Sequence, residues 1–362
     1  MAENIFQDFQ AVSKEEWLIK VEKDLKGKPL SDLDWMLGDM QIPPFYHSSD
    51  QVPSGALSSD KTNNDWEIGE DIHWHENKEA NKAALEGMMG GANATVFHLD
   101  SEKSGEDLEV LLDQIELPYI STHFRGDLAV AKWSDLLDAI SKVAEEKAYD
   151  VGSLKGSINL KITSFEEIQN LLSHHLSNWK LLQLELPYSI KEDSAEVLAD
   201  FLLQAHQLLG STPVEHRAAI LDRLMISVAI GTSYFIEIAK LRALHVLWAN
   251  LAKAYDVGQS LPELEVVLAE ASHDKNENTN MIRSTTQAMA AIIGGANRLV
   301  VRFANSESNI FTRRIARNVQ HLLKMESYLD RVVDPAAGSY YMEALTNQLA
   351  EKAWSIFQIK LA

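Results

Sequence analysis

The chain has 362 residues, of which 46% are hydrophobic and 24% charged, and its formal net charge is −20. This composition excludes an intrinsically disordered protein, and the absence of cysteine excludes disulfides and thiolate metal sites. The negative charge argues against nucleic acid and anionic membranes as partners. No apolar run approaches the ~20 residues that cross a bilayer, and the start of the chain lacks the pattern of a signal peptide. We therefore expect a cytoplasmic protein.

Residues 1–70 are predicted to form an arm that precedes the main domain. Ser13 and Glu16 have the spacing of a capping box, which predicts a helix over about 13–26. The segment that follows is rich in proline, serine and aspartate and cannot bury much surface by itself. It nevertheless carries the aromatic residues Trp35, Phe45 and Tyr46. We expect these residues to pack on the chain's own main domain or on a partner, because a disordered tail would leave them in water.

From about residue 71 onward, strand and helix patterns alternate. The predicted strands are 95–99, 119–124, 158–162, 181–186, 224–230, 264–268, 299–301 and 332–333. The predicted helices are 79–89, 106–115, 133–147, 165–176, 195–209 and 234–255, with further helices from 310 and over 344–357. Eight strands alternating with helices favour an α/β fold, a closed (β/α)8 barrel over residues 71–362, rather than an open doubly wound sheet.

One internal echo supports this alternation. Residues 89–93 read MGGAN and residues 293–297 read IGGAN, and each stretch ends a predicted helix and introduces a strand. Glycine favours the tight turn that ends a helix. In a barrel, such a helix-to-strand turn lies on the face opposite the active site. Chance recurrence of a common turn motif is the alternative.

The last third of the chain carries its most specific motifs. Residues 314–318 read RIARN, residues 334–341 read DPAAGSYY, and a second block lies between 229 and 249. These motifs resemble the substrate barrel of the methylmalonyl-CoA mutases. The resemblance implies an adenosylcobalamin-dependent isomerase that interconverts (R)-methylmalonyl-CoA and succinyl-CoA in propionate metabolism.

Several residues on which the family's chemistry depends have no counterpart here. The Asp-x-His-x-x-Gly loop, whose histidine ligates cobalt in the family, does not occur in the sequence. Where active chains read Gly-Tyr-His, this chain reads Pro187-Tyr188-Ser189, and His273 stands in a shortened version of their Thr-His-Ser-Gln run. The early Thr-Ile-Arg-Gln-Tyr stretch has no counterpart around Trp66.

The resemblance therefore implies the non-catalytic small subunit, a barrel portion without the cobalamin-binding domain. Its active site would be degenerate and its role mainly structural, and isomerase activity would belong to a heterodimer with a large catalytic subunit. Adenosylcobalamin is expected in that complex, and none is expected on this chain alone. Two alternatives stay open: an autonomous barrel that binds a small acidic metabolite or an acyl-CoA, and a homodimeric scaffold in isolation.

No catalytic residue is assigned from the sequence, and the candidates for a remodelled barrel mouth are His98, His123 and His273. The first two fall near the ends of the first two predicted strands, where a barrel opens to its active site. No metal site is predicted, because His73 and His75 have no third ligand nearby in the sequence and are interpreted as surface histidines.

Two charged features of the family motifs have a structural interpretation as well as a functional one. The arginines of residues 313–317 could receive phosphate, but a solvated helix face or ion pairs with acidic neighbours is favoured. Asp334 could be catalytic in an unknown barrel. Since it precedes Pro335, we interpret it as a turn residue that bonds its own backbone.

Overall fold

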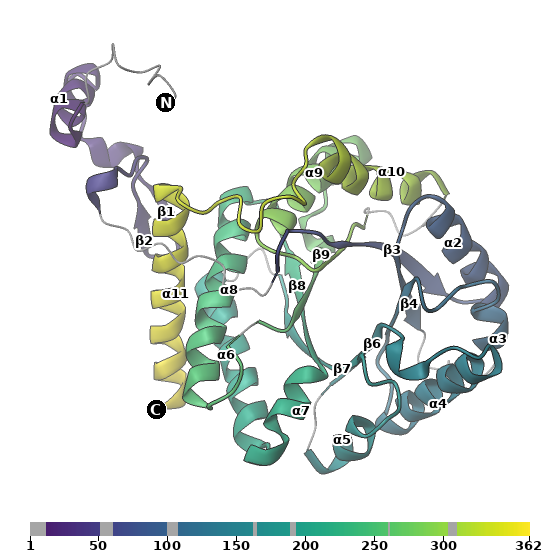
Figure 1. Cartoon of the computed structure of the whole chain (residues 1–362). Helices are drawn as coiled ribbons and strands as arrows, with labels where there is room; N and C mark the ends of the chain where they lie inside the picture. Colours follow the sequence, from purple (N-terminus) through teal and green to yellow (C-terminus); the bar gives the residue numbers. More distant parts are fainter. Residues whose placement is uncertain are drawn as a thin grey trace, which may run out of the picture.

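The computed structural model describes residues 12–50, 61–99, 108–161, 165–188, 193–259, 261–302 and 310–362. Eight parallel strands close into a barrel in the order β10-β3-β4-β5-β6-β7-β8-β9, with helices packed around the outside (Figure 1). The strands are β3 (Glu67–Trp74), β4 (Ala94–Leu99), β5 (Ser121–Arg125), β6 (Gly156–Leu160), β7 (Trp179–Leu186), β8 (Leu224–Ile230), β9 (Glu263–Leu268) and β10 (Arg298–Val300). The predicted (β/α)8 barrel is confirmed.

The main helices of the outer ring follow the strands in sequence. They are α2 (Asn77–Met89), α3 (Leu108–Leu111), α4 (Val130–Glu146), α5 (Phe165–Leu172), α6 (Ser194–Ser211), α7 (Arg217–Asp222), α8 (Tyr234–Ala254), α9 (Glu277–Ile293), α10 (Ile310–His321) and α11 (Tyr340–Leu361). Helix α8 is buried on nearly every side because α6, α9 and α11 pack around it. Helix α11 adds a further layer outside α6 and α8 (Figure 1). Within the described ranges, no helix combines the length and apolar character that a membrane span requires.

The first barrel strand differs from the prediction. Residues 332–333, predicted as the eighth strand, form no strand, and Val332 is exposed. The missing strand is β3, which crosses the expected boundary between arm and barrel at residue 70. Its charged residues Glu67, Glu70 and Asp71 obscure the strand pattern in the sequence, because acidic side chains are disfavoured in strands unless neighbours compensate them. The predicted number of strands is therefore correct, but β3 takes the place of the strand predicted at residues 332–333.

The two MGGAN-like turns are structurally equivalent. Gly91 and Gly295 both have positive φ, 90° and 97°. The side-chain oxygen of Asn93 then accepts from the backbone of Ile68 at 2.6 Å, and that of Asn297 accepts from Leu264 at 2.9 Å. Each turn thus joins the start of its own strand to the neighbouring strand, which explains why both repeat glycine and asparagine at the same positions.

The family-type motifs form buried ion pairs that lock helices together. The guanidinium of Arg242 on α8 is fully buried and donates to Asp334 and, at 2.8 Å, to Glu343. Asp334 also accepts from the backbone of Ala336 at 3.2 Å, which confirms it as a turn residue. Arg242, which lies in the sequence block between 229 and 249, therefore holds the DPAAGSYY turn against α8.

The RIARN helix has a similar structural pairing. Arg317 on α10 donates to both carboxylate oxygens of Glu70 on β3, at 2.6 and 2.7 Å, and Arg313 donates to Glu86 on α2 at 3.0 Å. The prediction of ion pairs with acidic neighbours is confirmed for these two arginines. Gly87 provides the space, since a Cβ at that position would lie 2.8 Å from the Glu70 side chain.

The arm is only partly attached to the barrel. Its helix α1 (Lys14–Asp24) has the predicted capping box and contains no buried residue. The hairpin of β1 (Trp35–Leu37) and β2 (Met40–Ile42) lies beside α11, while α1 projects away from the barrel (Figure 1). After the hairpin, Tyr46 stacks edge-on against Tyr341, with ring centroids 5.9 Å apart, and accepts from Gln348 of α11 at 3.2 Å.

Candidate functional site

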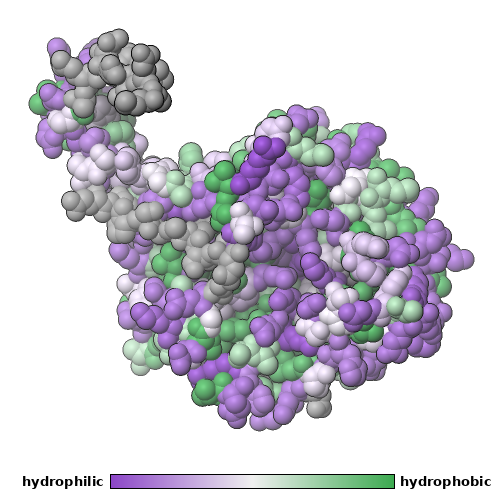
Figure 2. Space-filling model, in the orientation of Figure 1, coloured by the Kyte–Doolittle hydropathy of each residue, from purple (hydrophilic) through white to green (hydrophobic). Residues whose placement is uncertain are grey.

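The inside of the barrel is lined by polar and charged residues. The strand register pairs His98 of β4 with Arg125 of β5, and Arg298 of β10 with Glu265 of β9. Residues paired in this way point to the same side of the sheet. Contacts between strands far apart in the ring show that this side is the interior. Barrel interiors are usually filled by branched apolar side chains, whereas this one is filled by ion pairs. Hydrophilic residues also dominate the face seen in Figure 2.

Nearest the amino-terminal end of the strands, these contacts join β3, β5 and β10. Arg298 donates from Nη1 to Glu67 Oε2 at 2.9 Å and to His123 Nε2 at 2.8 Å. Because a guanidinium can only donate, Nε2 of His123 accepts and its ring proton lies on Nδ1. That nitrogen lies 2.8 Å from the hydroxyl of Ser157. Burial and the charge of Arg298 lower the pKa of His123 to about 4, so the ring is neutral at physiological pH.

A cavity of about 560 Å³ lies at the amino-terminal end of the strands, next to these contacts. Glu67, His123 and Arg298 line it, together with residues at the starts of neighbouring strands. It lies at the end of the barrel opposite the one where barrel enzymes carry their active sites.

A buried ion pair spans the barrel. Arg125 donates from Nε and Nη2 to the two carboxylate oxygens of Glu265, at 3.1 and 2.8 Å. The same carboxylate accepts from Nε of Arg298 at 2.8 Å. Strands β5 and β9 occupy opposite positions in the ring, so the Arg125–Glu265 pair crosses the full width of the bore. Burial opposes ionisation of Glu265, but the two guanidinium charges hold its pKa well below the ordinary value.

The mouth of the barrel contains a smaller charged cluster. Asp71 of β3 lies 2.6 Å from Nε2 of His98, and Arg302, just after β10, donates from Nε to Asp71 at 3.2 Å. Burial opposes ionisation of Asp71, but the charge of Arg302 and the contact with His98 outweigh it and lower its pKa to about 2. The ring of His73 lies 5.4 Å from that of His98.

The three histidines proposed as mouth residues occupy three different environments. His98 lies in the mouth cluster. His123 does not lie at the mouth, because β5 continues to Arg125 and leaves His123 buried in the bore. His273 follows a short 3₁₀ turn after β9, and burial lowers its pKa. In the described parts of the chain, no hydrogen bond or ring contact joins His273 to either of the others. The structure therefore does not assemble them into one site.

The residues that fill the bore were not recognised from the sequence. They are Glu67, Arg125, Glu265 and Arg298. One signal could have indicated them: in β9, Glu263 and Glu265 stand two positions apart in a strand whose remaining residues are apolar, and in β5 Ser121, His123 and Arg125 recur at the same spacing. An alternation of this kind predicts a polar face on an otherwise buried strand. Among the described residues, no group of three or more histidine, aspartate or glutamate side chains could hold a metal ion.

Comparison with known proteins gives a consistent result. The profile of the family described as methylmalonyl-CoA mutase matches residues 216–360. The chain is also 30% identical, over 98% of its length, to the methylmalonyl-CoA mutase small subunit of Porphyromonas gingivalis, and covers 64% of that protein. The chain is therefore similar to the methylmalonyl-CoA mutases.

Other mutases show the same relationship over shorter stretches. The methylmalonyl-CoA mutase of Rhizobium meliloti is 27% identical over 80% of the chain, which covers 43% of that protein. The methylmalonyl-CoA mutase large subunit of Porphyromonas gingivalis is 34% identical over 39% of the chain, which covers 21% of that protein. The chain thus spans less than two thirds of the length of each of these mutases.

The residues of this chain do not fit the cobalt-ligating loop of the mutase family. The nearest Asp-x-His sequence is Asp71-Ile72-His73, and it lies within barrel strand β3 rather than in a loop. Its aspartate is already paired with Arg302 and His98. The residue three positions after His73 is Glu76, where the motif requires glycine. Nothing in this chain's described residues therefore offers a mutase-type site for adenosylcobalamin.

Proposed function

We propose that this chain is the small subunit of a methylmalonyl-CoA mutase and that it acts with a separate large catalytic subunit. The heterodimer interconverts (R)-methylmalonyl-CoA and succinyl-CoA in the cytoplasm, as a step of propionate metabolism. Adenosylcobalamin is held by the large subunit. This chain contributes mainly a folded barrel and a surface that binds the large subunit. Its own active site is degenerate.

The observation that carries this proposal is the Arg125–Glu265 pair across the bore. A substrate that entered the barrel would have to separate these two buried charges, and leaving one of them unpaired costs several kcal/mol. Arg298 increases that cost, since it shares the same carboxylate. The filling of the bore supports a structural barrel rather than one that opens to a thioester.

The mouth supports the same conclusion. At the position where active chains carry Gly-Tyr-His, the ring of Tyr188 packs directly on Gly231. The ammonium of Lys240 lies 5.9 Å from the centre of that ring and pairs with Glu237. The tyrosine is thus used in packing at the end of β7. Moreover, the family motifs at 314–318 and 334–341 form the buried ion pairs of Arg317 and Arg242, which stabilise the fold.

Co-expression with the large subunit tests the proposal. We expect the two chains to purify as a stable complex whose mutase activity depends on adenosylcobalamin, and we expect this chain alone with the cofactor to be inactive. Substantial activity of the isolated chain, or the absence of any complex, would show the proposal to be wrong.

The alternative function is binding of a small acidic metabolite or an acyl-CoA at the barrel mouth. Arg302 and His98 are the groups there that would meet a carboxylate. Titration calorimetry of the isolated chain with succinate and with succinyl-CoA separates the two functions. Saturable heat that disappears in Arg302→Met favours the autonomous barrel, whereas no heat favours the subunit.

A further inference from the structure

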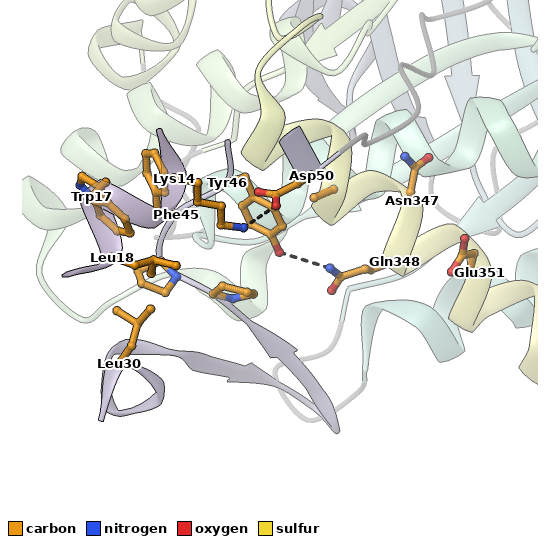
Figure 3. Close-up of a pocket in the computed structure, with 13 residues that line it drawn as sticks. Lys14, Trp17, Leu18, Leu30, Phe45, Tyr46, Asp50, Asn347, Gln348 and Glu351 are labelled. Atoms are coloured by element: carbon orange, nitrogen blue, oxygen red, sulfur yellow. Dashed lines mark hydrogen bonds and ion pairs between the residues drawn. The ribbon is translucent and has the colours of Figure 1, made fainter. Parts of the chain in front are cut away.

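A second cavity, of about 590 Å³, lies between the arm and helix α11. Trp17 and Leu18 of α1 and Phe45 of the segment after β2 form one side, and Gln348 and Glu351 of α11 form the other (Figure 3). The aromatic rings of Trp17 and Phe45 stack with centroids 4.2 Å apart. The cavity is therefore an apolar groove, whose two sides come from opposite ends of the chain.

Polar contacts border the groove. Lys14 pairs with Asp50 on the arm side, and Tyr46 accepts from Gln348 at 3.2 Å across the base (Figure 3). Further along α11, Lys352 pairs with Asp39 of the hairpin and, at 2.6 Å, with Asp193 at the start of α6. These contacts hold the arm at a set distance from α11. They leave a gap between the apolar side formed by the arm and the mostly polar face of α11.

The groove lacks an occupant from the described part of the chain. Helix α1 buries none of its residues, and Phe45 is 38% exposed although it stacks on Trp17. Exposed apolar surface of this kind, beside a concave surface, marks interaction sites. The arm would lower its free energy if a further apolar side chain filled the gap.

Charge indicates which partner fits. Lys14 is paired with Asp50, so the solvent-exposed carboxylate of Glu351 gives the lining of the groove a net negative charge. A basic side chain beside the apolar anchor would satisfy it. A second copy of this chain is a poor occupant, because two chains with a net charge of −20 each repel one another.

We propose that this groove receives a helix of the large subunit that presents a large apolar side chain flanked by arginine or lysine. The inference rests on the proposed function, and it assigns part of the subunit interface to Trp17, Leu18, Phe45 and Glu351. A helix laid in an apolar groove is a common mode of recognition, with anchors at helical spacing.

Binding of the purified large subunit to variants of the full chain tests the assignment. We expect Leu18→Glu and Glu351→Arg each to weaken the complex at least about tenfold, because one places a charge among apolar anchors and the other repels a basic partner. The matched controls are Met89→Glu, at an 82% exposed apolar residue remote from the groove, and Glu145→Arg, on the exposed side of α4. Circular dichroism confirms that each variant is folded.

The lack of cysteine allows a direct readout of occupancy. Leu30→Cys, which lines the groove, carries an environment-sensitive fluorophore, and Met89→Cys carries the same label as a control. A response at position 30 alone on addition of the large subunit supports the proposal. A complex that forms without that response, or that tolerates both groove variants as well as the controls, overturns it and leaves the proposed function intact. A response caused by self-association assigns the groove to a second copy and also overturns it. Failure of the unmodified chain to form any complex overturns the proposed function itself.

Discussion

Arg125 and Glu265 face each other across the barrel from strands on opposite sides of the ring, with Nη2 and Oε2 2.8 Å apart. Both side chains are almost completely buried, and Glu265 is shared with Arg298. A charge that is removed from water in this way is stable only while its partner stays in place. The barrel therefore depends on a polar brace where most barrels depend on apolar packing.

Arg125→Met is expected to lower the free energy of unfolding by about 3 kcal/mol, because it leaves part of the Glu265 carboxylate buried without a partner. Urea denaturation followed by circular dichroism measures this loss. The control is Lys142→Met, since Lys142 forms only exposed ion pairs with Glu109 and Glu146, which contribute little. A loss below about 1 kcal/mol for Arg125→Met would mean that the brace is no stronger than a surface pair.

His123 predicts a pH dependence of stability. Its pKa is about 4 in the folded chain, against about 6.5 for an unperturbed histidine. The unfolded chain therefore binds a proton that the folded chain does not, so this contribution to stability is complete above pH 6.5 and is lost as the pH falls toward 4. The expected loss is roughly 3 kcal/mol.

His123→Gln tests this assignment, because glutamine can still accept from Arg298 but does not titrate. Unfolding free energies measured from pH 7 to pH 4.5 should fall less steeply in the variant than in the unmodified chain. Equal slopes would assign the pH dependence to other groups, such as His73, whose pKa is also lowered, chiefly by burial.

Asp71 titrates in a lower range. Because its folded pKa is depressed to about 2, it contributes stability above the ordinary value of about 3.9, and this contribution is lost as the pH falls toward 2. Asp71→Asn should therefore lower stability by about 2 kcal/mol at pH 7 and change it little near pH 2. The difference between variant and parent across this range is the measurement, and a constant difference would show that the carboxylate charge is not what matters.

Arg242 connects two parts of the sequence that carry the family motifs. Arg242→Met should cost about 3–5 kcal/mol, because Asp334 and Glu343 would both remain as buried charges without their guanidinium. Arg314→Met, on the exposed side of α10, should be close to neutral. Thermal unfolding of the two variants distinguishes a structural motif from a functional one: a folded and equally stable Arg242→Met chain would contradict the structural role.

The alternation of strands and helices was predictable because it is local. The capping box at Ser13 and Glu16 and the glycine turns at 89–93 and 293–297 follow from neighbouring residues alone. Strand β3 was missed for the same reason, since its acidic residues look unfavourable until Arg317 and Arg302 compensate them from later elements.

The filling of the bore could not be predicted from local patterns. Arg125 and Glu265 are 140 positions apart, and Arg298 and His123 are 175 apart, so each pair exists only once the ring has closed. His123 was placed at the mouth because the predicted strand ended one residue early. Strand periodicity shows which residues share a face, but it does not show which charges on that face will meet.

The position of the hairpin β1–β2 against α11 has a consequence for how the protein is made. The arm is synthesised before the barrel, yet the surface on which it packs belongs to α11. At 5–20 residues per second, the arm waits roughly 15 to 60 seconds after leaving the ribosome before α11 follows. During that interval Trp35 and Tyr46 have no docking surface. The two strands of the hairpin have only three residues each. Edge strands this short offer few unpaired backbone groups to another unfinished chain.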